Sequence, residues 1–230
     1  MTTETEKPPY DPEARGLRLV AVLLGLTVVS GLIDAVSYLG LGHVFTANMT
    51  GNVVVLGFAA AGAPGFSVPH TLTSLCCFLL GAVAGGRVAV HLGGGSRRTW
   101  TRITLAAEAV LVGASAAVAF AAPGATATTY TLISLTAFAM GLRNATVRKL
   151  GIPDLTTTVL TMTLTGLAAD SRLAGGGSHP RSPRRTASVV AMAVGALLGA
   201  WLVIHHGLGI PLLIAAAVTG VLAVVASGRE

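Results

Sequence analysis

The chain has 230 residues, of which 53% are hydrophobic and 10% are charged, and its mean hydropathy is +0.76. A soluble domain carries about 25% charged residues, so the composition excludes an ordinary soluble protein and predicts an integral membrane protein. The formal net charge is +6. The basic residues stand in short gaps between apolar stretches, with no aromatic-plus-basic pattern, which argues against nucleic-acid binding and makes the charge a signal of topology.

The first 16 residues, MTTETEKPPYDPEARG, are polar and contain three prolines. We expect residues 1–16 to form a disordered cytoplasmic tail. The apolar stretch that follows is long and lacks a small-x-small cleavage site, so it is expected to stay as a membrane helix rather than a cleaved secretory signal. Residues 17–226 are expected to form a single polytopic membrane domain.

Eight apolar stretches follow one another along the chain. They cover about 17–40, 44–62, 70–92, 102–121, 128–146, 155–169, 187–205 and 208–226. A helix needs about 20 residues to cross the hydrocarbon of a bilayer, and most of these stretches qualify. The second stretch begins with a polar cluster, and the sixth, LTTTVLTMTLTGLAA, is short and rich in threonine.

Lysine and arginine in the loops decide between two topologies, because positive loops stay in the cytoplasm. The N-terminal flank, the gap at 93–102, the region 143–150 and the basic flexible loop 171–186 all carry arginine. If all eight stretches cross, these segments fall on both sides of the membrane. If the second and sixth dip in and return, they fall on one face. We therefore favour an all-α fold of about six transmembrane helices plus two broken or re-entrant polar segments, with both termini cytoplasmic.

Three short motifs recur in the same order in the two halves of the chain. The motif at 31–35 (GLIDA) recurs at 141–145 (GLRNA), Thr-Gly at 50–51 recurs at 165–166, and Gly-Ala-x-x-Gly at 81–85 recurs at 195–199. The two Gly-Ala-x-x-Gly motifs also predict close contacts between helices. Each half would hold three crossings and one dipping segment, and an odd number of crossings inverts the second half. We predict two weak inverted repeats, about 17–121 and about 128–226, which is a recurring plan of transporters.

Asp34 is the first candidate for chemistry, because it is an acid inside an apolar stretch. An ionisable group in a membrane helix is expensive and often functional. One interpretation makes Asp34 a proton carrier, or a ligand for a cation or substrate. The other makes it a cap for the free amides of the next segment, or the partner of a basic residue. Its counterpart in the repeat is Asn144, a neutral isostere, which we include among the candidate pathway residues.

A second candidate is the polar cluster that precedes the second apolar stretch. It comprises Asn48, Thr50, Gly51 and Asn52. If a half-helix begins near Thr50, its first N–H groups are free, and Asn48 and Thr50 can cap them. The cluster could line a substrate pathway, with a matching wall from Thr161, Thr163, Thr165 and Gly166 in the second half. The alternative is an ordinary cap in a tight turn between helices.

Two further charges interrupt the apolar stretches. Glu108 lies early in the fourth stretch and Arg87 lies late in the third, so we predict a structural ion pair between them if these spans are antiparallel neighbours. Arg143 is placed at the end of the fifth stretch and is expected to extend to the cytoplasmic headgroups.

No enzyme, cofactor or metal site is predicted. The adjacent Cys76 and Cys77 are expected to be packing residues rather than a disulfide. His91, His205 and His206 have no spacing with carboxylates or thiolates that would suggest a metal site. No nucleophile elbow, phosphate loop or zinc motif occurs in the sequence.

The segment GLIDAVSYLGLGHVFTANMTGN at 31–52 resembles the signature of the YoaK-type family of small bacterial multi-pass membrane proteins, a domain of unknown function. The residues that match it are Gly31, Asp34, Ala35, Phe45, Asn48, Thr50, Gly51 and Asn52. The second-half GLRNA motif and its later Thr-Gly also fit the pattern. The resemblance implies an integral protein of the bacterial cytoplasmic membrane with six or seven spans. It implies no particular substrate.

The expected function is therefore that of a small secondary transporter or permease for a small solute in the lipid bilayer, with Asp34 as the candidate proton site. The alternative is a non-transporting membrane protein that assembles with or regulates a partner; a homo-oligomer is compatible with either. A transporter should gather Asp34, Asn48, Thr50 and Asn52 around one cavity with the threonines of 161–166. A scaffold should bury them in pairwise hydrogen bonds with no cavity.

Overall fold

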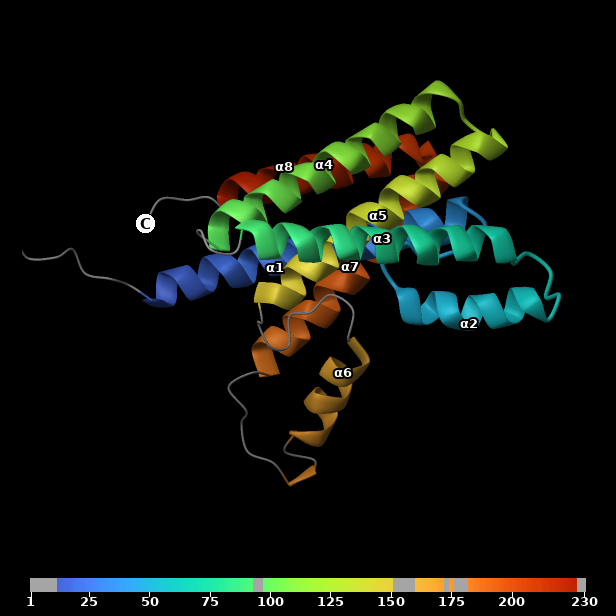
Figure 1. Cartoon of the computed structure of the whole chain (residues 1–230). Coiled ribbons are helices and arrows are strands. Elements are labelled where there is room, and N and C mark those ends of the chain that lie inside the picture. The colour runs from blue at the N-terminus through green and yellow to red at the C-terminus, as the bar shows by residue number, and fades with distance from the viewer. Residues whose placement is uncertain (1–11, 93–96, 151–159, 172–173, 176–181, 227–230) are drawn as a thin grey trace, which may run out of the picture.

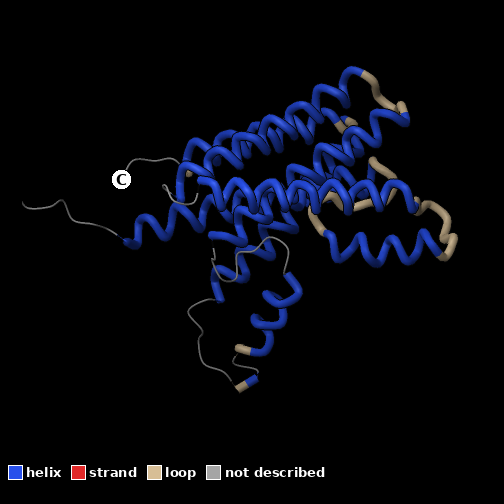
Figure 2. The backbone as a smooth tube through the Cα atoms, in the orientation of Figure 1, coloured by secondary structure: helices blue, strands red, loops and turns tan. Residues whose placement is uncertain are grey.

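The computed structural model describes residues 12–92, 97–150, 160–171, 174–175 and 182–226, and the long regular elements within them are all helices (Figures 1 and 2). The helices are α1 (Pro12–Gly40), α2 (Met49–Ala60), α3 (Val68–Leu92), α4 (Arg97–Ala121), α5 (Thr126–Leu150), α6 (Leu160–Ala169), α7 (Ser182–His206) and α8 (Gly209–Val225). Each predicted apolar stretch corresponds to one helix. The all-α fold is thus confirmed.

Several boundaries differ from those expected. α1 already begins at Pro12, so residues 12–16 belong to a helix and only residues 1–11 of the predicted tail lie outside the described ranges. α7 likewise begins at Ser182, inside the predicted loop 171–186. The first half of the sixth stretch, residues 155–159, also lies outside the described ranges.

α1 and α5 occupy the middle of the bundle, and the other long helices surround them (Figure 1). α1 packs against α7 and α8, α5 packs against α3 and α4, and α4 packs along α8. The two short helices are peripheral, since α2 packs on α3 and α6 packs on α7. The two halves have matching neighbours: if α1–α4 are exchanged in order with α5–α8, so that α1 takes the place of α5, the same pairs of helices remain in contact.

Glycines bring the backbones of α1 and α7, and of α3 and α5, into direct contact. A Cβ atom added to Gly31 would lie 2.3 Å from the carbonyl oxygen of Met192, and one added to Gly141 would lie 2.0 Å from that of Phe78. Real Cβ atoms do not approach oxygen so closely, so a side chain at either position would force the helices apart.

The Gly-Ala-x-x-Gly motifs make the reciprocal contacts. A Cβ atom at Gly195 would lie 2.0 Å from the carbonyl oxygen of Val28, and one at Gly81 would lie 2.1 Å from that of Phe138. The GLIDA motif of the first half therefore packs on the glycines of the second half, and GLRNA packs on those of the first. The predicted close helix contacts are confirmed.

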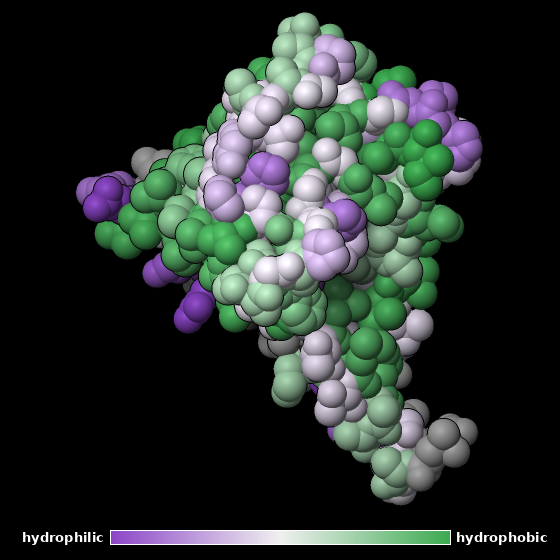
Figure 3. Space-filling model, turned by 90° about the vertical axis from the view of Figure 1, so that its right-hand side faces the viewer, coloured by the Kyte–Doolittle hydropathy of each residue, from purple (hydrophilic) through white to green (hydrophobic). Residues whose placement is uncertain are grey.

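The outside of the bundle is apolar. Val110 on α4 and Leu197 on α7 are each 71% exposed, and Leu79 on α3 is 61% exposed. In Figure 3, hydrophobic side chains cover wide areas of the flanks of the molecule, with hydrophilic side chains between them. Exposed apolar surface of this extent on a soluble monomer would be an association site, whereas a membrane protein presents it to lipid.

Among the described residues, four helical segments are long and apolar enough to cross a membrane by length and composition. They are Val20–Gly40, Val68–His91, Thr99–Ala121 and Pro183–His206. α8 has 17 residues, and α5 carries Arg143, Arg148 and Lys149 along its 25 residues. These spans and the apolar exterior are those of a membrane protein.

Candidate functional site

The turn between α1 and α2 is fastened to α3 by Asn52, which is 0% exposed. The side-chain amide of Asn52 donates to the carbonyl oxygen of Phe45 at 2.6 Å and to Oγ of Ser74 at 3.1 Å, and its Oδ1 accepts from the Phe45 N–H at 2.8 Å. Ser74 also donates to the Phe45 carbonyl oxygen at 2.6 Å. The backbone of Phe45 is therefore held by two side chains that come from different helices.

Asn48 is the N-cap of α2, as the sequence predicted. Its Oδ1 accepts from the N–H of Gly51 at 3.2 Å and satisfies one of the free donors at the helix start. A Cβ atom at Gly51 would lie 2.7 Å from the ring of Phe45, so glycine is needed for the turn to fold back onto the helix.

Asp34 lies near the C-terminal end of α1, and its carboxylate faces the same turn. Its Oδ1 accepts from the N–H of Ala47 at 2.9 Å, and the backbone amides of Thr46 and Asn48 also interact with the carboxylate. Asp34 therefore does bind the free amides that precede α2, as the second interpretation of the sequence expected.

Asp34 also faces a cavity of about 320 Å³ that both halves of the chain line. The first half contributes Asp34, Asn48, Thr50 and Gly51, and the second half contributes Thr161 at the start of α6 and Met192 on α7. Asp34 is only 6% exposed, whereas Thr50 and Thr161 are exposed. The cavity thus runs from the surface between α2 and α6 to a buried carboxylate.

Five of the candidate pathway residues do not line this cavity, namely Asn52, Asn144, Thr163, Thr165 and Gly166. Thr163 is buried within α6. Asn52 uses its side chain in the turn described above. Asn144 lies half-buried on α5. Thr165 is exposed and donates to the Thr161 carbonyl oxygen at 2.9 Å, and a Cβ atom at Gly166 would lie 2.7 Å from the guanidinium of Arg185. The repeat thus placed the second wall one helical turn too far along α6.

A buried ion pair between Arg143 and Glu108 lies inside the bundle, and two predictions made from the sequence are wrong because of it. Arg143 on α5 donates from Nε to Oε2 of Glu108 on α4 at 2.9 Å, and its Nη2 also contacts Oε1 of Glu108. The two side chains are 1% and 0% exposed. The predicted Arg87–Glu108 pair is therefore wrong, because Arg87 is exposed on α3. Arg143 does not reach the headgroups either.

The ion pair is tied to two further helices. Nη1 of Arg143 donates to the Leu26 carbonyl oxygen at 2.9 Å and to Oγ of Ser30 at 2.8 Å, both on α1. Oγ1 of Thr219 on α8 donates to Glu108 at 3.3 Å. Side chains or backbone atoms of α1, α4, α5 and α8 therefore converge on one buried charge pair.

Helix boundaries explain why the sequence missed this pair. α5 continues to Leu150, so Arg143 lies about two turns before the helix end instead of at it. α4 begins at Arg97, so Glu108 lies about three turns inside it. The sequence did contain one signal of this pair: an acid and a base each lie deep inside an apolar helix, where each needs a partner of opposite charge.

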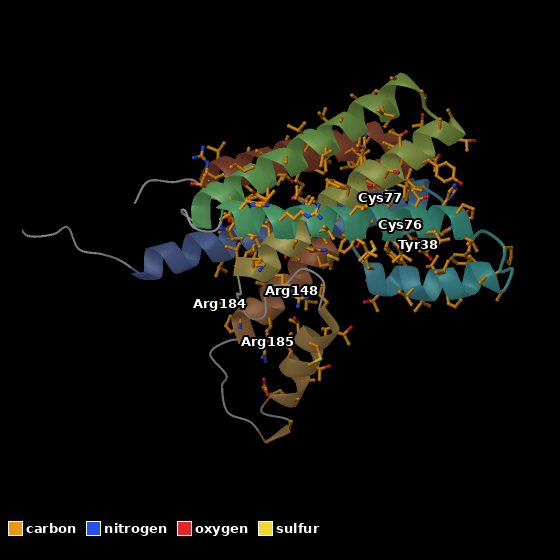
Figure 4. All side chains as sticks on the ribbon, in the orientation of Figure 1. Tyr38, Cys76, Cys77, Arg148, Arg184 and Arg185 are labelled. Carbon is orange, nitrogen blue, oxygen red and sulfur yellow. The ribbon has the colours of Figure 1, made fainter. Side chains whose placement is uncertain are left out.

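α6 is attached to α7 by an ion pair nearer the surface. Nη1 of Arg185 lies 2.6 Å from Oδ2 of Asp170, which is 41% exposed. Figure 4 shows Arg148, Arg184 and Arg185 where α5 ends and α7 begins, beside α6. This part of the molecule is strongly basic.

The described residues contain no group of three or more His, Cys, Asp or Glu side chains that could hold a metal ion, and both cysteines are free. A further hollow of about 520 Å³ lies between α4 and α8, with Arg102 as its charged lining residue. It contains none of the predicted site residues.

Comparison with known proteins identifies the family of this chain. The family model "Protein of unknown function (DUF1275)" matches residues 22–225. The UPF0700 transmembrane protein YoaK of Bacillus subtilis (strain 168) is 36% identical over 148 residues, which span 63% of this chain and 64% of the relative, slightly less than two thirds of its length. No solved structure matches the chain. With the family match covering most of the polytopic domain, the chain belongs to the DUF1275 family, to which the YoaK-type resemblance of its GLIDA and Asn-Met-Thr-Gly-Asn motifs had pointed.

Proposed function

We propose that this chain is a small secondary transporter or permease whose solute binds in the cavity between α2, α6 and α7. The observation that carries the proposal is the lining of that cavity: polar residues from both halves of the chain surround a buried carboxylate. Broken segments from two related halves that meet inside the membrane are typical of secondary transporters. A polar cavity of this kind is also where non-helical backbone can be accommodated at membrane depth.

The proposed topology has six crossings, with α2 and α6 entering the membrane without crossing it. α2 has 12 residues, which rise about 18 Å, far less than the hydrocarbon thickness of about 30 Å. The described part of α6 has 10 residues and is shorter still. With six crossings, the basic ends of α4, α5 and α7 lie on one side of the membrane, which would be the cytoplasmic side with both termini.

The proposed architecture is two inverted repeats, and the glycine contacts support it. The contact of Gly31 with α7 corresponds to that of Gly141 with α3 at an offset of 110 residues in α1 and α5. The contact of Gly195 with α1 corresponds to that of Gly81 with α5 at an offset of 114 residues in α3 and α7. If the sequence similarity were due to chance in a glycine-rich chain, there would be no reason for the glycines of each half to make equivalent contacts with the other half.

Asp34 is the proposed site of proton coupling, because it is the ionisable side chain among the described residues that line the cavity. The proposed location of the protein is the bacterial cytoplasmic membrane. The relative in Bacillus subtilis, which is named a transmembrane protein, supports this location.

The experiment is an uptake screen in proteoliposomes under an imposed pH gradient, with radiolabelled small solutes. We expect the proton gradient to drive the accumulation of at least one solute inside the vesicles. Asp34→Asn should abolish the proton-linked flux while the protein stays folded, whereas Glu13→Gln, an equivalent charge removal in the first turn of α1, should not. No flux for any solute, with folded protein in the vesicles, would contradict a transporter.

The non-transporting alternative, an assembly or regulatory protein of the membrane, has one observation in its favour. Asn52, which was expected at the cavity, is instead paired with Phe45 and Ser74. A protein that shows no flux but co-purifies with a stoichiometric membrane partner would favour this function.

A further inference from the structure

The charges inside the described part of the bundle do not balance. The buried ionisable side chains there are Asp34, Glu108 and Arg143. Two acids and one base leave one negative charge when all three are ionised. A charge buried in a membrane protein without a partner is costly, so the carboxylate at such a site is expected either to hold a proton or to meet a counter-charge.

The imbalance is located at Asp34. Arg143 acts electrostatically on Asp34, but all three of its side-chain nitrogens are already engaged with Glu108, Ser30 and the Leu26 carbonyl oxygen. Among the described residues, no lysine, arginine or histidine lines the cavity that Asp34 faces. The carboxylate therefore has hydrogen bonds from backbone amides but no full positive charge of its own.

An anionic solute would make this imbalance worse. The N-terminus of α2 would attract an anion through its free N–H groups, but Asp34 and Asn48 already accept from the N–H groups of Ala47 and Gly51. A neutral solute would leave the charge of Asp34 uncompensated. A cation is the ligand whose charge completes the site.

The size and the walls of the cavity indicate what kind of cation fits. Its volume, about 320 Å³, is at the small end of ligand cavities. The side chains of Val54, Leu160 and Met192 supply apolar surface, and the hydroxyl groups of Thr50 and Thr161 supply hydrogen-bond acceptors. An alkali ion would need a shell of oxygens in place of those apolar side chains.

We infer that the cavity binds a small organic ammonium ion, with its nitrogen at the Asp34 carboxylate and its alkyl group against Val54, Leu160 and Met192. This assignment rests on the proposed function, since it names the class of solute that the cavity takes. A proton and the ammonium group then compete for one carboxylate, and their exchange on Asp34 couples uptake of one to release of the other.

The test uses three probes that share one alkyl body and differ in the head group: 3,3-dimethylbutylammonium, 3,3-dimethylbutan-1-ol and 3,3-dimethylbutanoate. Calorimetry measures their binding to the purified full-length protein in detergent. We expect the ammonium probe to bind at least about tenfold more tightly than the alcohol, because a charge-assisted hydrogen bond is added, and the carboxylate probe to bind most weakly. This comparison within the wild-type protein needs no variant.

Asp34→Asn should reduce binding of the ammonium probe to the level of the alcohol, since asparagine can still accept from Ala47 but carries no charge. Glu13→Gln is the matched control: it lies 21 residues earlier on α1, about 31 Å along the helix axis, and should leave binding unchanged. Preferred binding of the carboxylate probe, equal binding of ammonium and alcohol, or saturable binding of sodium in their place would each overturn the inference.

Flux measurements separate this inference from the proposed function. Selective binding of the ammonium probe without flux in proteoliposomes would support the cavity assignment and contradict transport. Flux of another solute without selective binding of the ammonium probe would support transport and overturn the assignment.

Discussion

Arg143 and Glu108 form a fully buried ion pair that joins α5 of the second half to α4 of the first. The pair has no counterpart across the proposed repeat. At the offset of 110 residues that relates α1 to α5, Arg143 corresponds to Ile33, which is 0% exposed in the hydrophobic core. The ion pair is therefore one feature that distinguishes the two halves of the bundle.

Removing one charge of this pair should destabilise the protein. Glu108→Gln leaves Arg143 buried without a counter-ion, and we expect the free energy of unfolding to fall by about 3–5 kcal/mol. Thermal or detergent-induced unfolding of the purified protein measures this change.

Two further variants control the ion-pair experiment. The double variant Glu108→Leu/Arg143→Met removes both charges and should lose much less stability than Glu108→Gln alone. Arg87→Gln, at the exposed position that the sequence suggested as the partner, should change stability by less than about 0.5 kcal/mol. A loss at Arg87 as large as that at Glu108 would be incompatible with the observed pairing.

The close approach of α3 and α5 predicts that glycines on one helix differ sharply in their tolerance of a methyl group. Gly81→Ala places a Cβ atom against the Phe138 backbone and should cost about 1–3 kcal/mol, because the helices must separate. Gly86→Ala, on the same helix with no atom within 4 Å of the new Cβ, should be neutral or stabilising. Unfolding measurements that gave equal effects at the two positions would disprove the contact.

Single cysteines in a Cys76/Cys77-free background test the six-crossing topology. Cysteines at Ala63 and Gly124 should react with an impermeant thiol reagent from outside the cell. With eight crossings, both loops would instead face the cytoplasm and would be labelled only after the membrane is opened. Cysteine at Gly207 is the positive control, because both topologies place it outside the cell. Cysteine at Ser182 is the negative control, because both topologies place it in the cytoplasm.

The turn before α2 is predicted to depend on Asn52. Asn52→Ala removes three hydrogen bonds to Phe45 and Ser74, and we expect a loss of about 1–3 kcal/mol with faster amide hydrogen exchange over residues 41–48. Ser74→Ala leaves the bonds between Asn52 and Phe45 and should have a smaller effect. Unchanged exchange in Asn52→Ala would mean that other contacts hold the turn.

Local signals predicted much of the fold correctly. Apolar length located the eight helices of the described residues, because each must cover its backbone with hydrocarbon-compatible side chains. The Asn48 cap was predictable because capping needs only residues within one turn. The Gly-Ala-x-x-Gly motifs indicated close helix contacts for the same local reason, since only residues without a long side chain allow the backbones to meet.

Pairing between distant segments could not be predicted in the same way. Arg143 and Glu108 are 35 residues apart, and which base meets the acid depends on the rotation and depth of two helices that the sequence bounds only approximately. Thr161 at the start of α6 lines the cavity of Asp34, whereas Thr165 and Gly166 do not. Which residues of α6 reach the cavity depends on how far that helix is shifted along α7.

The sequence by itself determined that this protein is helical, belongs in a membrane and carries a cluster of polar groups at the turn before α2, because hydropathy, capping and glycine spacing act over a few residues. Only the tertiary structure decided that Arg143 neutralises Glu108 and that Asp34 is left facing a cavity. The physical reason is that compensation of a buried charge depends on distances in space, which follow from the packing of helices far apart along the chain.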